Sequence, residues 1–405
     1  MTIIMMMDFL IIFKNRFLVV LAGVLLYGCI DPFDAVFVDF ESAVVIEATI
    51  TDEMKQQQIF LSRSYEFEDE GPSAEPNATV SVSDGTGNTF SFEDTGNGVY
   101  VSTQAFAAEP GKEYQLSVTT QDGRSYGSEV TEITSSTTLD EIKAERITND
   151  DGVDGMAILA DSFDPSGNAK NYRYEYQETY RIIAPTWTPT SLVGEPGGGC
   201  ALLKVPNTTD DEVCYTTDFS NRIIITSTED LAEDRVSNFM VRFISRDNYI
   251  ISHRYSILVR QFVQSNEAFT FFETLNELSG SESLFSQTQP GFLQGNVFSN
   301  DNRDERVLGF FDVSSVSEKR IFFNFDDFYP GEPLPPYIES CRFSSPPIAS
   351  PAGCVLRPLI ESGAGIYAGD NGEPLDGEGP FFVVPRVCGD CNVLGATEIP
   401  DFWIE

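Results

Sequence analysis

The sequence of 405 residues has a single histidine, His253, and only 25 basic residues against 63 acidic ones, a formal net charge of −38. One histidine excludes sites that need two, such as the zinc-binding HExxH motif. The acidic excess argues against nucleic acid as a partner, because phosphate binding requires a basic face. Apolar residues still make up 41% of the chain, which is enough for a sizeable core and argues against global disorder.

The apolar run near the N-terminus is short. It contains 11 residues, from Phe17 to Tyr27, and follows the basic residues Lys14 and Arg16. A membrane-spanning helix needs about 20 apolar residues, so this run is too short to cross a bilayer. A basic start followed by a short apolar segment is instead typical of a secretory signal peptide.

The run ends in Leu-Tyr-Gly-Cys at residues 26–29, where a small residue stands directly before Cys29. This pattern resembles the bacterial lipobox, which signal peptidase II cuts before the cysteine that carries the lipid. We therefore expect a lipoprotein signal peptide at residues 1–28, a lipid on Cys29 and a tether at residues 29–40. The alternative is a buried cysteine in an uncleaved signal anchor. The expected lipid is a strong anchor, because each buried CH₂ contributes about 0.8 kcal/mol.

Six cysteines remain after Cys29, and an even number in an exported chain indicates disulfides. They are Cys200, Cys214, Cys341, Cys354, Cys388 and Cys391. Their spacing favours a local bridge between Cys200 and Cys214, worth about 3 kcal/mol for a loop of about 15 residues. Two alternatives concern the C-terminal cysteines: a four-thiolate zinc site, or a redox pair formed by Cys388 and Cys391.

Residues 41–135 predict a small β-sandwich of the immunoglobulin or fibronectin kind. Short β-rich runs alternate with turn signals such as Asp84-Gly85 and Asp122-Gly123. Seven such runs in about 95 residues are typical of a sandwich. The expected strands lie at residues 43–50, 59–63, 78–82, 89–92, 99–101, 114–119 and 125–130.

Residues 136–405 predict a larger β-rich domain with a disulfide-stapled C-terminal segment. A helix is expected near residues 265–279, because Ser265 can cap it and Ala268, Phe272 and Leu275 recur at helical spacing. The other expected features are a long loop from Thr186 to Phe219 and a closing hairpin made of residues 306–313 and 320–325.

Aromatic residues supply the candidate ligand-binding side chains. Tyr172, Tyr174, Tyr176 and Tyr180 recur at period two, so they share one face of a strand. The first three, together with Trp187, are candidates for stacking on a sugar or another ligand. The alternative is that the tyrosines pack in a core with their hydroxyl groups bonded to a partner.

Catalytic patterns are weak. A Ser-His-Asp triad would have to use His253, which lies within a strand-like segment. The only Gly-x-Ser-x-Gly sequence, at residues 123–127, falls between an expected turn and an expected strand rather than between a strand and a helix, so no nucleophile elbow is expected. Asp326 and Asp327 are candidates for a paired-carboxylate site, but adjacent acids arise by chance in so acidic a chain. We therefore expect no enzymatic activity and no cofactor, and metal binding stays open.

Several segments together resemble a known family. In order and spacing, the chain is similar to a Bacteroidota family of outer-membrane lipoproteins classed as a domain of unknown function. Its members are commonly encoded beside TonB-dependent receptors of the SusC type. The segments that carry the resemblance are residues 44–52, 59–64, 78–84, 98–100, 110–114, 254–261, 295–296, 307–310, 318–321, 388–391 and 402–403.

The resemblance implies a surface-exposed lipoprotein of the outer membrane that partners a SusC-like receptor and aids nutrient capture. It implies no catalytic residues. Two alternatives remain open: a stand-alone adhesin or glycan- or peptide-binding module, and a hydrolase. The residues themselves support the first expectation through the lipobox and the predicted disulfide-stapled β-modules.

Overall fold

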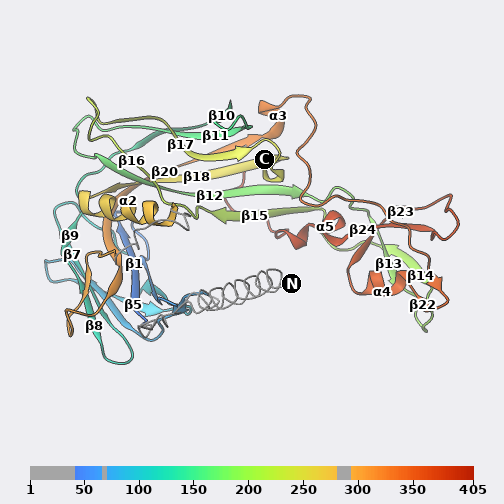
Figure 1. The fold of residues 1–405 in the computed structure, drawn as a ribbon, viewed down its shortest axis with the longest axis horizontal. Coiled ribbons are helices and arrows are strands. Elements are labelled where there is room, and N and C mark those ends of the chain that lie inside the picture. The colour runs from blue at the N-terminus through green and yellow to red at the C-terminus, as the bar shows by residue number, and fades with distance from the viewer. Residues whose placement is uncertain (1–41, 66–70, 281–292) are drawn as a thin grey trace, which may run out of the picture. The chain divides into compact units, whose positions relative to one another are not determined.

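Figure 1 shows the computed structural model, in which residues 42–65, 71–280 and 293–405 are described. The expected fold class, mainly β with one main helix and disulfides that include the C-terminal region, is confirmed. Strands that lie between Val44 and Asn324 join in one large sheet, in which strands from distant parts of the chain are neighbours. This sheet connects two hydrophobic cores.

The first core lies in the N-terminal module, which starts at Ala43 and whose strands alternate between buried and exposed residues. In β1, Val44, Ile46, Ala48 and Ile50 point into the core, which has 21 buried apolar residues. The seven strands expected from the sequence are all present, with small shifts at their ends. They and two short additions are β1 (Val44–Thr51), β2 (Gln58–Arg63), β3 (Ser73–Ala74), β4 (Thr79–Ser83), β5 (Thr89–Asp94), β6 (Val99–Ser102), β7 (Glu113–Thr119), β8 (Ser125–Ser128) and β9 (Thr131–Glu132).

Two strands from much later in the chain complete this module. These are β19 (Val297–Ser299), which pairs with β8, and β20 (Val307–Asn324), whose first half runs parallel to β1. The boundary predicted near residue 135 falls between β9 and the next strand, yet Val297 and Phe311 belong to the N-terminal core. The module is therefore discontinuous in sequence.

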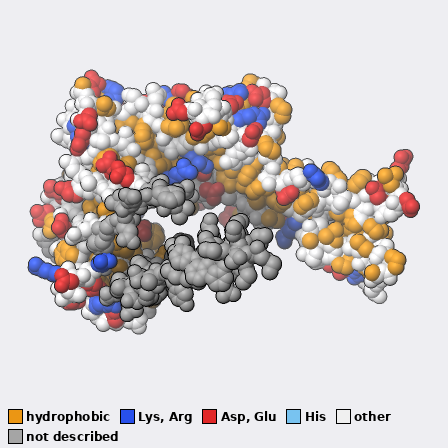
Figure 2. Space-filling model, in the orientation of Figure 1, with side chains coloured by type: hydrophobic (Ala, Val, Ile, Leu, Met, Phe, Trp, Pro, Cys, Tyr) orange, Lys and Arg blue, Asp and Glu red, His pale blue; other side chains and the backbone are white. Residues whose placement is uncertain are grey.

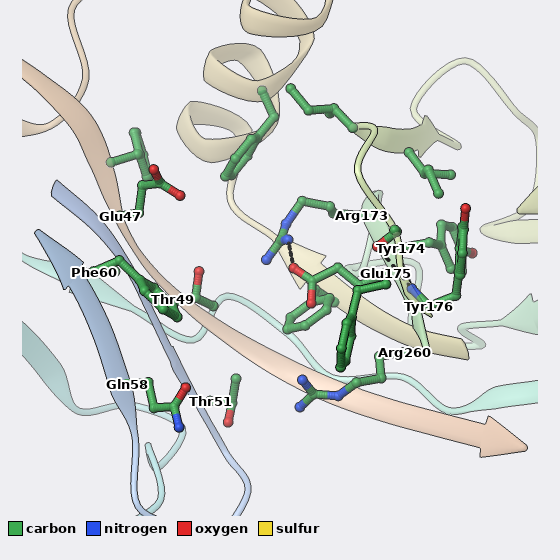
Figure 3. A pocket seen from close by; sticks show the side chains of 18 of the residues that line it. Glu47, Thr49, Thr51, Gln58, Phe60, Arg173, Tyr174, Glu175, Tyr176 and Arg260 are labelled. Carbon is green, nitrogen blue, oxygen red and sulfur yellow. Dashed lines mark hydrogen bonds and ion pairs between the residues drawn. The ribbon is translucent and has the colours of Figure 1, made fainter. Parts of the chain in front are cut away.

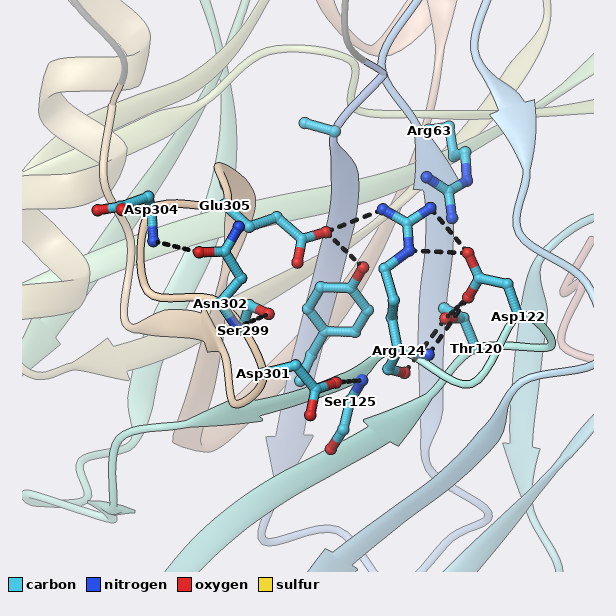
Figure 4. Close-up of polar contacts among 12 residues, drawn as sticks. Arg63, Thr120, Asp122, Arg124, Ser125, Ser299, Asp301, Asn302, Asp304 and Glu305 are labelled. Carbon is cyan, nitrogen blue, oxygen red and sulfur yellow. Dashed lines mark hydrogen bonds and ion pairs between the residues drawn. The ribbon is translucent and has the colours of Figure 1, made fainter.

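Close backbone contact and polar bonds hold these late strands in place. A Cβ on Gly295 would lie 1.8 Å from the carbonyl oxygen of Gly309, so only glycine fits there. Asn296 exchanges two 2.8 Å hydrogen bonds with the backbone of Phe311. After β19, Glu305 accepts hydrogen bonds from Arg124 and Tyr126, which fixes the loop against β8 (Figure 4).

The second core belongs to the central module. A three-stranded sheet packs on the large sheet, and 26 buried residues fill the space between them. The strands are β10 (Leu139–Thr148), β11 (Asp154–Phe163) and β17 (Arg235–Ser245) in the small sheet, and β12 (Asn171–Ile183), β15 (Val213–Phe219), β16 (Ile224–Ser227) and β18 (Arg254–Gln264) in the large one; a 3₁₀ turn, η1 (Tyr249–Ile251), precedes β18.

The second half of β20 belongs to this central module, where residues 315–324 pair antiparallel with β18. The closing hairpin predicted from residues 306–313 and 320–325 is therefore wrong. The intervening residues 314–319, Ser-Ser-Val-Ser-Glu-Lys, contain no glycine or proline to turn the chain. One 18-residue strand instead changes partners, from β1 up to Ser314 to β18 from Ser315 onward.

The predicted helix is α2 (Asn266–Gly280). The Ser265 hydroxyl accepts a 3.1 Å hydrogen bond from the Ala268 amide, which confirms the expected cap. Ala268 and Phe271 pack on Phe310 of β20, and α2 also contacts β12 and β18. The helix thus covers part of the large sheet on the face opposite to the two cores.

The third region, the C-terminal lobe, is formed by residues 186–210 and 334–392. The predicted loop from Thr186 to Phe219 is wrong, because it contains the hairpin of β13 (Thr190–Gly194) and β14 (Leu202–Pro206) and then β15. The short helix α3 (Phe325–Phe328) lies just before the lobe. The lobe itself contains β21 (Ala349–Ser350), β22 (Gly353–Cys354), α4 (Leu356–Glu361), β23 (Gly365–Asp370), β24 (Phe381–Pro385) and α5 (Arg386–Gly389), and η2 (Cys391–Val393) lies at its end.

All six cysteines form disulfides, as expected, but the predicted Cys200–Cys214 pair is wrong. The pairs are Cys200–Cys354, Cys214–Cys391 and Cys341–Cys388. The turn between β13 and β14 carries Cys200 into the lobe, whereas Cys214 lies opposite Ile182 in the central core.

The same pairing contradicts the zinc and redox alternatives. An extended residue, Asp390, separates α5 from η2, so Cys388 and Cys391 turn toward different partners. None of the four C-terminal thiols is left free to bind zinc or to pair within the CxxC motif.

Candidate functional site

A groove of about 1160 Å³ lies on the face of the large sheet that points away from both cores (Figure 3). Its floor consists of outward-facing residues of β1, β2, β12, β18 and β20. Phe271, Phe272 and Leu275 of α2 form one wall, and residues 219–224, between β15 and β16, form another. Because β20 joins β1 to β18, the groove spans both modules on a continuous hydrogen-bonded sheet.

Strand alternation explains which side chains face the groove. On β12, Tyr172, Tyr174 and Tyr176 turn their rings into the central core, so Arg173 and Glu175 turn to the opposite face. The same alternation on β1 buries Ile46 and Ala48 and presents Glu47 and Thr49.

Arg173 is the most enclosed cation of the groove. Its guanidinium lies 4.2 Å from the ring centre of Phe262 and 5.0 Å from that of Phe272. It forms an ion pair with Glu175, while its Nε has no hydrogen-bond partner among the described residues (Figure 3). An unpaired donor in a buried side chain costs free energy, which a bound acceptor would recover.

Arg260 lies at the centre of the groove floor. It pairs with Glu53 and, at 3.4 Å, with Glu318 on the neighbouring strand. Burial raises the pKa of Glu53, but Lys55 and Arg260 together outweigh that effect and hold it below its usual value. The floor charges therefore largely neutralise one another.

A buried polar cluster lies under α2, beside Arg173. The Asp312 carboxylate accepts hydrogen bonds from Ser314, at 2.6 Å, and from Gln264, at 3.4 Å. Burial raises the pKa of Asp312, and the positive charge of Arg173 opposes this shift. The second oxygen of Asp312 has no partner in the described part of the chain.

The aromatic candidates from the sequence are not brought together as a binding surface. Tyr174 and Tyr176 border the groove, but their rings are only 1% and 9% exposed. The Tyr172 and Tyr174 hydroxyls donate 2.9 Å hydrogen bonds to Asp234 and Gln261, as the core interpretation expects. Trp187 does not line the groove; it packs beside the central core and donates to Asp211.

The catalytic candidates lie outside the groove, where the His253 carbonyl accepts a 3.2 Å hydrogen bond from the N–H of Phe325, next to Asp326. Burial and the nearby Arg181 lower the pKa of His253, and its side chain has no hydrogen bond to a carboxylate among the residues described. The Asp327 carboxylate accepts the backbone N–H of Asn324 at 2.7 Å, so it caps the short helix α3. Neither arrangement resembles a nucleophile with its base.

Within residues 42–65, 71–280 and 293–405, no group of three or more His, Cys, Asp or Glu residues is placed to hold a metal ion. None of the helices in these ranges is long and apolar enough to cross a membrane. Cys29, the predicted lipidation site, lies outside the described residues, as do the predicted signal peptide and tether.

Residues 30–320 match the sequence profile of a domain of unknown function, DUF4249. The chain belongs to the DUF4249 family. No match was found among curated proteins. Every residue that lines the groove, from Val45 to Glu318, lies within the DUF4249 segment, whereas the second part of the C-terminal lobe, residues 334–392, lies beyond it.

Sequence reasoning missed the groove residues Arg173, Glu175 and Arg260. A usable signal was present on β12, because the alternation that groups the tyrosines also groups the charged residues between them. The sequence does not show which strands are neighbours. In the sheet, Arg260 of β18 lies opposite Glu175 of β12 on one side and opposite Glu318 of β20 on the other. These pairings need the long-range sheet order.

Proposed function

We propose that this DUF4249 protein is a lipoprotein of the outer membrane, anchored through Cys29 and exposed to the cell exterior. It acts without catalysis, as the partner of a SusC-like TonB-dependent receptor, and holds a nutrient in the groove before uptake. The Bacteroidota origin and the receptor partnership come from the resemblance described above.

The groove is the observation that carries this proposal. Ligand sites are typically concave, largely apolar and supplied with a few fixed polar groups. Here Phe60, Phe219 and Leu275 expose apolar surface at the rim, at 46%, 68% and 37%. The paired charges beneath them are fixed on strands, which gives a rigid floor for selective binding.

The membrane anchor is supported by the sequence alone. A basic start, an 11-residue apolar run and a small residue before Cys29 fit a lipoprotein signal. Cys29→Ser is expected to release the protein from the membrane fraction and to abolish labelling with radioactive palmitate. Cys200→Ser, which removes a structural cysteine, should leave the labelling intact. Labelling that survives in Cys29→Ser would contradict the anchor.

The receptor partnership is tested by affinity purification. Tagged full-length protein is isolated from the native outer membrane in mild detergent, and the co-purified proteins are identified by mass spectrometry. A TonB-dependent barrel should be recovered in near-stoichiometric amount, and not from cells that express the Cys29→Ser protein. Absence of a barrel, with retained binding of glycans or peptides, would replace this proposal with a stand-alone binding module.

A further inference from the structure

Two charged side chains of the groove stand out because they are unpaired. Six of its eight charged residues form ion pairs with one another: Glu53, Lys55, Arg173, Glu175, Arg260 and Glu318. The other two are Glu47 on β1 and Arg222 between β15 and β16, which are exposed and form no ion pair within the described ranges. One negative and one positive charge therefore stay available to a ligand.

These two charges come from different sides of the groove. Glu47 belongs to β1, in the N-terminal module, while Arg222 belongs to the segment that follows β15, in the central module. β12, β18 and β20 separate β15 from β1 in the sheet order. A ligand that satisfied both charges would thus lie across the floor, over Arg260 and its partners.

The rest of the lining offers hydrogen-bonding and apolar groups. Gln58 and Asn221 are exposed, and their amides have no hydrogen-bond partner among the residues described, so each can both donate and accept. Phe60 and Phe219 expose large ring surfaces close to these amides in sequence.

This set of groups defines the chemistry of the occupant. A carboxylate recognises an ammonium group, and a guanidinium recognises a carboxylate through two parallel hydrogen bonds. Side-chain amides match peptide N–H and C=O groups, and the phenylalanines match apolar side chains. Glu47 disfavours a phosphate, and a neutral oligosaccharide would form an ion pair with neither charge.

The groove is large for a single small molecule and favours an extended ligand. Its volume of about 1160 Å³ lies above the range of about 300–1,000 Å³ that is usual for drug-sized ligands. We propose that the groove binds a short peptide with free ends, its amino group at Glu47 and its carboxylate at Arg222. This inference rests on the proposed function, since it names the class of nutrient captured there.

The test uses detergent-solubilised full-length protein and isothermal titration calorimetry. The probes are a pentapeptide of alanine, leucine and phenylalanine with free ends, its N-acetylated form, its C-amidated form, and maltopentaose. The free peptide should bind, and blocking either end should weaken binding by about tenfold or more, because each block removes a charge-assisted contact. Maltopentaose should not bind.

Two variants test which groove residue binds each end of the peptide. Glu47→Gln should weaken binding of the free peptide about tenfold but leave binding of the N-acetylated form unchanged. Arg222→Gln should weaken binding of the free peptide about tenfold but leave binding of the C-amidated form unchanged. The matched controls, Glu141→Gln and Arg303→Gln, change exposed charges outside the groove and should have no effect.

The outcomes separate this inference from the proposed function. Two results would overturn the peptide assignment. Peptide binding could stay unchanged when both ends are blocked, or the control variants could weaken it as much as the groove variants do. Binding of maltopentaose that is lost in Phe60→Ala would keep capture in the groove but overturn the ligand class. Failure of all four probes, with a receptor still recovered from membranes, would overturn the inference and leave the partnership standing.

Discussion

The N-terminal module and the C-terminal lobe reach a stable fold by different means. The module has a core of 21 buried apolar residues and no cysteine between Ala43 and Ile133. The lobe buries five apolar residues besides cysteine, which are Leu192, Leu356, Tyr367, Val383 and Val384. Two of the three disulfides lie wholly within the lobe, and the third joins its end to the central core.

The difference follows from how much apolar surface each region can bury. A small segment that cannot build a sufficient core depends on covalent links, as secreted domains commonly do. The lobe also leaves large apolar side chains exposed, among them Leu203, Phe343 and Leu375. Figure 2 shows hydrophobic side chains gathered on the visible face of the lobe, at the right of the view. The groove lies on the large sheet that joins the two cores, so it belongs to the core-stabilised part of the chain.

The largest expected effect comes from removing a core side chain that β20 contributes to the N-terminal module. Phe311 is fully buried, so Phe311→Ala should lower the free energy of unfolding by about 3–5 kcal/mol. Urea unfolding followed by circular dichroism measures this change. Phe298→Ala on β19, where the ring is 40% exposed, is the control and should stay within about 1 kcal/mol of the wild type. Equal losses in both variants would show that β20 is not part of the core.

The next effect should appear in the lobe. Cys214→Ala with Cys391→Ala removes the link to the central core and should lower stability by about 2–4 kcal/mol. Limited proteolysis with mass spectrometry should locate the new cleavage sites at residues 186–210 and 334–392, while residues 43–133 stay intact. If the N-terminal module were cleaved first, the claim that disulfides stabilise the lobe and an apolar core stabilises the module would be contradicted.

A smaller effect is expected from the polar clamp on β20. Asn296→Ala leaves the Phe311 N–H and C=O without their 2.8 Å partners and should cost about 1–3 kcal/mol. Asn300→Ala removes an exposed amide from the same segment and serves as the control. The melting temperature of each variant gives the comparison, and an unchanged value for Asn296→Ala would mean that the clamp adds nothing to core packing.

The smallest effect concerns pH. Because the pKa of His253 is lowered in the folded protein, the unfolded chain takes up its proton first on acidification. His253 therefore contributes stability above its unfolded pKa, near 6.5, and that contribution is lost as the pH falls below 6.5 toward the lowered pKa of the folded state. His253→Gln should lose less stability than the wild type between pH 7.5 and 5, in urea titrations at about five pH values. An identical or steeper loss would contradict the burial of this imidazole.

Local patterns in the sequence were enough to predict the strands of the N-terminal module, the helix α2 and its Ser265 cap. Each depends on residues within a few positions of one another, such as the alternation in β1. The disulfide partners could not be predicted, because Cys214 and Cys391 are 177 residues apart and meet only through the central core. Proximity in sequence favoured Cys200 instead, which the β13–β14 hairpin carries away.

The groove could not be predicted from the sequence for the same physical reason. Glu47 and Arg260 share one sheet face only because β20 pairs in parallel with β1 and then antiparallel with β18. Nothing in the polar stretch around Ser314 and Ser315 signals this change of partner. Gly295 and Gly309 were noticed as part of the resemblance, but their role, close backbone contact, needed the fold.

The central claim is that a ligand is captured in the groove, on the core-stabilised part of the chain. Photo-cross-linking tests it most directly, with p-benzoylphenylalanine placed at position 219 on the groove rim or at position 298 on β19, both exposed phenylalanines. In full-length protein on cells that take up the nutrient mixture, mass spectrometry should detect ligand adducts at position 219 and none at position 298. Adducts at both positions alike, or only at position 298, would contradict the account.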